Sequence, residues 1–335
     1  MGFRLRKSIR IVPSVRMTFS KSGIGYSAGV KGYRVTKRAD GRIQRTASLP
    51  GTGLSYVTTS SGSGGSRRAP QRRSTPPRYA PTPVTRARTP GWFAPRATKD
   101  LYRAATAGDI AAMQQVRTSH AELAFAAAAL IGVHALSTGD NERALEPLES
   151  AFATGRDPAA DPFIAKYTSV RFSLSVADGV TAVLSLNRDA IGLALAEVYQ
   201  HHDRLDDAIK VVEQLEPTTY AAVSLAELYA EVEEWPEVID VTEGVTNEDD
   251  ATAMLCVYRG VAFREQALYE AARQSFKEAL RTKKRDPVVR HRALLERART
   301  YEREGKRAMA RKDLERIMAE DSNYEGLDQA IAELF

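Results

Sequence analysis

The 335-residue sequence lacks most of the features from which an activity is usually inferred. Its single cysteine, Cys256, excludes a disulfide within the chain and fits a reducing, cytoplasmic setting. Long hydrophobic runs are also missing: residues 123–139, the longest uncharged segment of residues 99–335, are short and weakly apolar for a span of about 20 residues, so we expect a buried helix there and no transmembrane segment. Residues 1–13 are basic but have no apolar stretch, which argues against a signal peptide.

Catalytic motifs are missing as well. The chain has no Walker loop, no Gly-x-Ser-x-Gly, no His-Glu-x-x-His and no Cys-x-x-Cys. The segment His201–His202–Asp203 suggests a metal site at first sight, but adjacent histidines on a helix point about 100° apart, so a solvated turn is the better interpretation. We therefore expect no enzyme, no metal and no cofactor, and we expect Cys256 to be a packed thiol.

Charge is distributed unevenly along the chain. Residues 1–60 carry 12 Lys or Arg and one acid, for a net charge of +11, and residues 61–98 carry 8 Arg and no acid. Residues 99–335 hold 28 basic and 41 acidic side chains, for a net charge of −13. This asymmetry predicts a basic N-terminal arm joined to an acidic body.

The first zone, residues 1–58, alternates apolar and polar residues in short runs separated by glycines. Val15, Met17 and Phe19 form one such run, and Tyr33 and Val35 belong to another, before the turn-forming Asp40–Gly41 pair. Alternation of period two with Gly-rich turns predicts a small antiparallel β module.

Three segments of this zone carry a resemblance to a known family. They are residues 2–8 (GFRLRKS), 20–23 (SKSG) and 49–56 (LPGTGLSY). With them the zone resembles the bacterial N-terminal module named domain of unknown function 4236. The resemblance implies a small β domain of bacterial origin and no particular activity.

Residues 59–98 form the second zone, which is rich in Ser and Gly and then in Pro and Arg. Seven prolines and no acids leave little to bury, so this zone is predicted to be a disordered linker. Trp92 and Phe93, near its end, are expected to pack on the helix that follows.

The third zone, residues 99–335, repeats one spacing of small and large residues. A small residue is followed by an aromatic three positions later, then by Ala and a bulky residue, as at Gly260, Phe263, Ala272 and Phe276. Further copies begin at Gly132, Ala196, Ala226 and Ala298. Small residues let two helices approach closely, and large ones fill the space between neighbouring hairpins.

In this spacing the chain resembles the tetratricopeptide repeat family over about 200 residues. The resemblance implies a mainly α fold, a solenoid of helical hairpins that binds a protein or peptide. Residues 100–117 are predicted to form a short capping hairpin. Alternating residues around Asp178–Gly179 predict a β-hairpin inserted near residues 169–185, because Asp-Gly between alternating runs is a strong hairpin signal.

The resemblance also implies a concave groove lined by the first helix of each hairpin. Carried onto the matched repeats, the groove positions are Glu197, Glu227, Glu231, Tyr258, Arg264, Arg292, Arg299 and Arg303. One end would be acidic and the other basic. Such charge runs are usually solvated faces; the alternative interpretation is that the arginines hold an acidic motif of a partner through charge-assisted hydrogen bonds.

Together these patterns predict a bacterial cytoplasmic adaptor, in which the repeats bind a protein or peptide and the basic N-terminal module docks or localises it. The alternative is a nucleic-acid-associated factor that binds phosphates through residues 1–98, where 20 Lys or Arg are interleaved with tyrosines. The same basic arm is also compatible with contact to anionic lipid or to the acidic repeats of its own chain, and with a role in solubility alone.

Overall fold

The chain divides into two compact units, Met1–Val84 and Thr85–Phe335. The computed structural model describes the backbone of six strands in the first unit and residues 88–334 of the second. The Asp40–Gly41 turn and the linker residues 61–87 lie outside the described residues, so the expectations for them stay predictions.

The first unit is an antiparallel sheet in which each strand pairs with the next along the chain. The alternating runs of the sequence fall on these strands: Met17 lies opposite Tyr26, and Ala28 opposite Val35. The strands are β1 (Lys7–Val12), β2 (Val15–Ser20), β3 (Gly23–Val30), β4 (Tyr33–Lys37), β5 (Ile43–Ser48) and β6 (Ser55–Ser60). The predicted small β module is confirmed.

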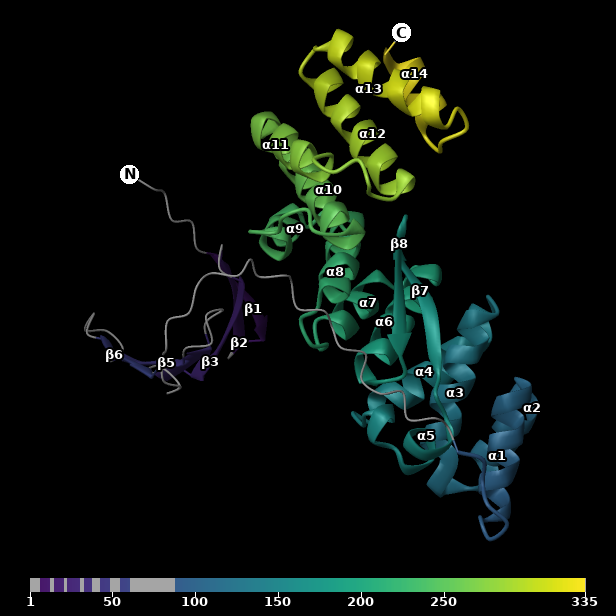
Figure 1. The fold of residues 1–335 in the computed structure, drawn as a ribbon. Helices are drawn as coiled ribbons and strands as arrows, with labels where there is room; N and C mark the ends of the chain where they lie inside the picture. The colour runs from purple at the N-terminus through teal and green to yellow at the C-terminus, as the bar shows by residue number, and fades with distance from the viewer. Residues whose placement is uncertain are drawn as a thin grey trace, which may run out of the picture. The chain divides into compact units, whose positions relative to one another are not determined.

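In the second unit, helices pair into antiparallel hairpins that stack one after another from α1 to α13 (Figure 1). The hairpins are α1–α2 (Arg96–Ala107, Ile110–Ser119), α3–α4 (Ala124–Ser137, Asn141–Ala153), α6–α7 (Arg188–His201, Leu205–Val212), α8–α9 (Thr219–Glu231, Trp235–Thr242), α10–α11 (Asp250–Glu265, Tyr269–Ala279) and α12–α13 (Pro287–Arg303, Arg307–Glu320). The short helices η1 (Ala121–Leu123), η2 (Pro158–Ala160) and α5 (Pro162–Tyr167) connect hairpins, and α14 (Leu327–Leu334) closes the array.

Each of the six hairpins turns in the same way. A residue with a positive φ follows the first helix, directly in α1–α2 and one residue later in the other five hairpins. The next backbone N–H donates to a carbonyl five residues back, which satisfies an open carbonyl at the helix end. The donor and acceptor are Leu268 and Phe263 in α10–α11, and Lys306 and Tyr301 in α12–α13, both at 2.8 Å. The left-handed residues are Gly108, Gly139, Asp203, Glu233, Ala267 and Gly305. Because the turn is the same, the second helix of each hairpin packs against the first in the same register.

The predicted pairing of small and large residues holds the helices of a hairpin together. A Cβ atom built on Gly260 would lie 2.6 Å from the ring of Phe276, which is fully buried, so the two helices are in contact through a glycine and an aromatic ring. Gly132 and Leu148 do the same in α3–α4, at 2.6 Å. Along α3 the alanines are buried, as expected for residues 123–139. The helical repeats are thus confirmed.

The inserted hairpin is also present, as β7 (Arg171–Ala177) and β8 (Val180–Ser185). Its side chains alternate between exposed and buried, so that Phe172, Leu174 and Ala182 form one buried face. Gly179 has a φ of 75° in the two-residue turn, a conformation that glycine adopts without strain.

One expectation at the start of this unit is wrong. Trp92 and Phe93 do not pack on the next helix: they are 87% and 96% exposed. The turn that carries them ends before α1 begins at Arg96, and the buried side of α1 is taken by Ala97, Leu101 and Ala104. In residues 88–334, no helix has the length and apolarity that a membrane crossing needs.

Candidate functional site

The first helices of the hairpins share one face, on which the hairpin β7–β8 lies. Strand β7 packs against α3, α6 and α8, strand β8 against α10, and the tip at Gly179 meets Val288 and Val289 at the start of α12. We call this surface of α3, α6, α8, α10 and α12 the inner face. Figure 1 shows the two strands running along the stack of helices with the tip toward α12. The groove that the sequence predicts to be open is therefore covered over much of its length by the chain itself.

Three predicted residues form an acidic cluster on α6 and α8. Glu197 and Glu231 both lie near Glu227, and Tyr258 of α10 donates its hydroxyl hydrogen to Glu227 Oε1 at 2.9 Å. Gln200 donates to Glu231 Oε1 at 3.2 Å. These side chains are brought together by the 3.6-residue period, because Glu227 and Glu231 are four residues apart on one helix.

Burial changes the acidity of this cluster. It raises the pKa of Glu227 to about 7, with a further contribution from Glu231 and Glu197 and against the opposing hydrogen bond from Tyr258. The pKa of Glu197 is raised by burial and by the charge of Glu231. At neutral pH the cluster therefore carries less negative charge than its three carboxyl groups suggest.

Three of the four predicted arginines converge on Glu296, a nearly fully buried residue of α12. Arg264 Nη1 donates to its Oε2 at 2.5 Å and Arg299 Nη1 to its Oε1 at 3.0 Å. Arg292 Nε lies 3.1 Å from the same Oε1. Arg264 also donates to Glu265, as does Arg303, at 2.7 Å to Oε2. The basic end of the inner face is thus one connected network of four arginines and two glutamates.

The network has more positive than negative charges. Burial alone would raise the pKa of Glu296, but Arg264, Arg292 and Arg299 together outweigh it and hold that pKa below its usual value. Glu296 and Glu265 are therefore ionised at neutral pH, and four arginines against these two carboxylates leave two positive charges. The side chains of Arg292, Arg299 and Arg303 remain 40%, 31% and 47% exposed, so guanidinium surface is open to a ligand.

Three carboxylates that matter here were not predicted. Glu296 and Glu265 were missed because the family's register gives the groove positions only. It does not show which neighbouring carboxylates pair with the arginines at those positions. The sequence does hold a signal for Glu296: it lies four residues after Arg292 and three before Arg299, a spacing that places all three on one helix face. Asp178, at the tip of β7–β8, is the other missed group, and its charge acts on Glu227 and Arg292.

The remaining candidates are structural or solvated. Cys256 is fully buried in α10, and burial raises the pKa of its thiol, which is against reactivity. α6 ends at His201, and His202 and Asp203 lie in the turn that follows, as the sequence predicts, but the His202 side chain is only 19% exposed. In the part of the chain that the structure describes, no group of three His, Cys, Asp or Glu side chains has a metal-binding arrangement.

Known proteins resemble both the N-terminal zone and the helical unit. Residues 3–57 match the model of the family described as "Protein of unknown function (DUF4236)". The helical unit is similar in fold to the N-terminal domain of the EccA1 ATPase from the ESX-1 secretion system of Mycobacterium tuberculosis, with a TM-score of 0.54 and 17% identity over 71% of this chain and 88% of that one. A tetratricopeptide repeat protein from Parabacteroides merdae aligns with a TM-score of 0.45 and 16% identity over 63% and 72% of the two chains. No curated protein sequence matches the chain. The helical unit is a tetratricopeptide-like solenoid of helical hairpins.

Proposed function

We propose that the protein is a non-enzymatic interaction scaffold of the bacterial cytoplasm. Its helical repeats bind a protein or peptide partner that carries an acidic motif, and its basic N-terminal module docks or localises the complex. The observation that carries this proposal is the network on α10 and α12, where four arginines face two glutamates on the inner face. A likeness of fold to repeat domains supports binding as the task of the helical unit.

The position of the hairpin β7–β8 restricts where a partner binds. Its buried face covers α3 to α10, and its tip stops at the first turn of α12. The part of the inner face beyond the tip holds Arg292, Arg299 and Arg303, each with exposed guanidinium surface. We therefore place the partner on α12 and not along the whole inner face.

The chemistry of α12 favours a carboxylate ligand. Each guanidinium presents several N–H donors in a planar fork, and only some of them are used by Glu296 and Glu265. Those two carboxylates also hold the arginine side chains in place, so that less side-chain entropy is lost when a ligand binds. An acidic side chain or a C-terminal carboxylate of the partner would accept the remaining donors.

The test is a charge reversal on the exposed part of α12. The Arg299→Glu/Arg303→Glu variant of the full chain is compared with an Arg307→Glu/Lys312→Glu variant, which makes the same change in charge on exposed residues of α13. Both are used for affinity capture from the native host, with nuclease added and with proteins identified by mass spectrometry. We expect one protein partner to be retained by the unaltered chain and by the α13 variant and to be lost with the α12 variant. Undiminished capture by the α12 variant would refute the site.

The alternative function is association with nucleic acid through the basic N-terminal zone. The 20 Lys or Arg and single acid of residues 1–98 favour it, since neutralised phosphates release counterions and make binding depend steeply on salt. Replacing Arg67, Arg68, Arg72 and Arg73 by Gln in the full chain should then lower the slope of log affinity against log salt. If captured proteins disappear when nucleic acid is digested, this alternative replaces the scaffold.

A further inference from the structure

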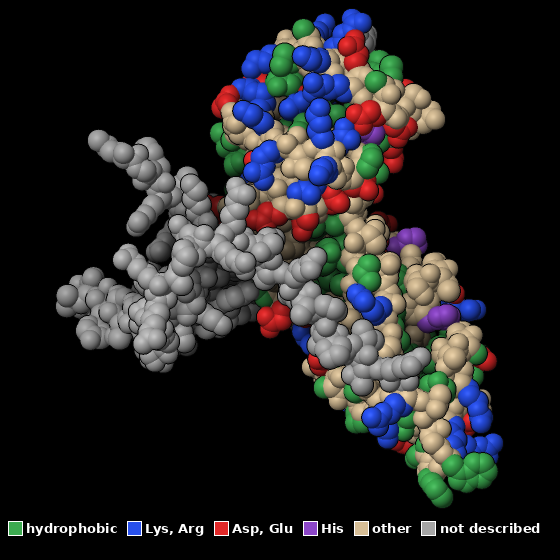
Figure 2. Space-filling view, in the orientation of Figure 1, with side chains coloured by type: hydrophobic (Ala, Val, Ile, Leu, Met, Phe, Trp, Pro, Cys, Tyr) green, Lys and Arg blue, Asp and Glu red, His purple; other side chains and the backbone are tan. Residues whose placement is uncertain are grey.

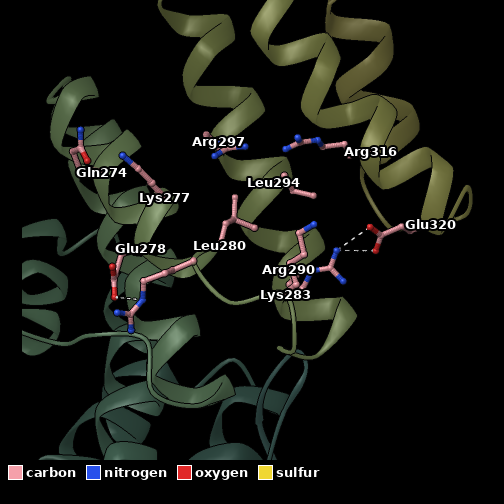
Figure 3. Close-up of a pocket in the computed structure, with 11 residues that line it drawn as sticks. Gln274, Lys277, Glu278, Leu280, Lys283, Arg290, Leu294, Arg297, Arg316 and Glu320 are labelled. Atoms are coloured by element: carbon pink, nitrogen blue, oxygen red, sulfur yellow. Dashed lines mark hydrogen bonds and ion pairs between the residues drawn. The ribbon is translucent and has the colours of Figure 1, made fainter.

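A basic pocket lies on the other side of α12, away from the inner face. It is enclosed by the end of α11, the loop that follows, α12 and α13, and has a volume of about 700 Å³ (Figure 3). Six of its lining residues are basic and only two, Glu278 and Glu320, are acidic. The basic residues are Lys277, Arg281, Lys283, Arg290, Arg297 and Arg316.

The helical period separates this pocket from the proposed partner site. Arg290, Leu294 and Arg297 follow one another at spacings of four and three, so they share the face of α12 that lines the pocket. Arg292 is two residues from Arg290, about 200° around the helix, and belongs to the network around Glu296. One helix thus presents two different arginine surfaces.

Three of the pocket arginines are held by acidic partners. Arg281 Nε lies 3.2 Å from Glu278 Oε1. Arg290 Nη2 donates to both carboxylate oxygens of Glu320, at 2.8 and 3.0 Å. Arg297 donates from Nε and Nη2 to Asp313, both at 2.7 Å. Such pairs immobilise the guanidinium groups and so prepare a rigid wall.

The other cations are not neutralised in this way. Within residues 88–334, the side chains of Lys277 and Lys283 make no hydrogen bond or ion pair. Arg316 is 56% exposed and lies 3.9 Å from Asp313, a carboxylate already engaged by Arg297. These three residues come from α11, the loop and α13, and Figure 3 shows Arg316 pointing toward Arg297 across the upper part of the pocket. The pocket therefore has cationic groups on several sides and a surplus of positive charge.

The surrounding surface has the same sign. Figure 2 shows Lys and Arg side chains gathered over the C-terminal helices of the second unit, with fewer acidic side chains between them. In sequence, residues 259–318 hold 18 basic and 9 acidic side chains. A field of this kind attracts anions to the pocket and raises their local concentration.

We propose that this pocket binds an oligophosphate group, either free or as part of a nucleotide. In an oligophosphate each phosphoryl group carries at least one negative charge and several acceptor oxygens, so two or three in series match cations that converge from three segments. Two of the lining residues are hydrophobic, the half-buried Leu280 and the buried Leu294. This suits a compact ligand with at most one flat ring, and is too little for the apolar face of a partner helix.

The shape also argues against a nucleic-acid duplex. The pocket is a half-open hollow between three helices and a loop, whereas proteins read a duplex with elements that protrude into its grooves. The volume of about 700 Å³ falls among those of small-molecule sites.

The experiment is calorimetric titration of the full chain with sodium tripolyphosphate, with ATP and with hexaglutamate as an acidic peptide. Two variants, Lys283→Glu and Arg316→Glu, alter exposed pocket residues, and Arg307→Glu makes the same change on the opposite side of α13. Thermal unfolding of each variant shows that the fold is kept. We expect saturable binding of tripolyphosphate that both pocket variants weaken at least about tenfold and Arg307→Glu leaves within about twofold.

The two sources of the ligand are separated by the same titrations. Tighter binding of ATP than of tripolyphosphate identifies a nucleotide whose base contacts Leu280 and Leu294, and equal binding identifies the phosphate chain alone as the recognised group. Three results would overturn the proposal: no saturable binding of either compound, binding that both pocket variants leave unchanged because it belongs to the basic N-terminal zone, or hexaglutamate binding as tightly as tripolyphosphate.

Discussion

The carboxylate of Glu296 is the most informative group to remove, because it is nearly fully buried and three arginines share it. In a Glu296→Gln variant the side chain keeps its size and one acceptor oxygen but loses its charge. Arg264, whose side chain is 7% exposed, then keeps only Glu265 as a charged partner. Removal of this one negative charge should therefore weaken the packing of α10 against α12.

The magnitude follows from the exposure of the three arginines. Removal of one partner from a buried ion pair costs about 3–5 kcal/mol, because the remaining charge stays desolvated. Here Arg292 and Arg299 are 40% and 31% exposed and regain water, and Arg264 retains Glu265. The loss in the free energy of unfolding should thus lie at the low end, at about 3 kcal/mol.

Urea unfolding followed by circular dichroism measures this loss. With a slope of about 1–3 kcal/mol per molar urea, the midpoint should fall by about 1 M or more. Repeat arrays often unfold in stages, so hydrogen exchange of the α10 and α12 amides provides a local measurement of the same loss. Glu302→Gln is the matched control, since Glu302 lies on the same helix and makes no side-chain hydrogen bond or ion pair within residues 88–334. The reasoning fails if Glu296→Gln moves the midpoint no further than this control does.

A pH series adds a second check on Glu296. Its pKa is depressed in the folded protein, so its contribution to stability is complete above the unfolded value of about 4.3 and is lost as the pH falls through the folded value. The difference between the unaltered chain and Glu296→Gln should therefore shrink on acidification below about pH 4. A difference that stays constant to pH 2.5 would mean that the charge of Glu296 is not what stabilises α12.

Three further predictions concern other parts of the second unit. Phe276→Ala leaves a cavity against Gly260 and should lower the free energy of unfolding by about 3–5 kcal/mol, measured in urea. Glu227 has a folded pKa of about 7, so its contribution to stability is lost as the pH rises from about 4.3 to 7. Glu227→Gln should therefore raise the melting temperature at pH 8 and not at pH 4; the same dependence of melting temperature on pH in both proteins would contradict this. Gly179→Ala adds a Cβ 3.0 Å from Val288 at a φ of 75°, so the hairpin tip should exchange amide hydrogens faster, with α1–α2 exchange as the unchanged reference.

Much of the helical unit was predictable because its information is local. A small residue at Gly260 and a large one at Phe276 meet since they lie at fixed positions on two helices joined by a short turn. Asp178–Gly179 between alternating runs predicts the β-hairpin for the same reason, because the turn type follows from two residues. Three turns place Asp203, Glu233 and Ala267 in the left-handed region without glycine, so turn chemistry alone would have missed half of the hairpins.

The candidate sites were predictable only in part. The family's register brings Glu197, Glu227, Arg264 and Arg299 to the inner face, yet it does not show that Glu296 neutralises part of the basic end. No motif in the sequence indicates the pocket behind α12. Its lining residues come from several elements and span more than 40 positions, from Gln274 to Glu320. Trp92 and Phe93 show the opposite error, since an apolar pair in sequence does not ensure a buried surface to receive it.

By itself the sequence determined that residues 99–335 contain helical hairpins, that antiparallel strands lie between residues 7 and 60, and that basic and acidic side chains gather in different parts of the chain. These are consequences of period, turn residues and composition, which act over a few positions. Only the tertiary structure decided that β7–β8 lies on the inner face, that Arg264 and Glu296 are buried together, and that Arg290 and Arg316 line one pocket. The reason is physical: burial and pairing depend on which distant surfaces meet, and a desolvated charge is stable only where its partner arrives from another part of the chain.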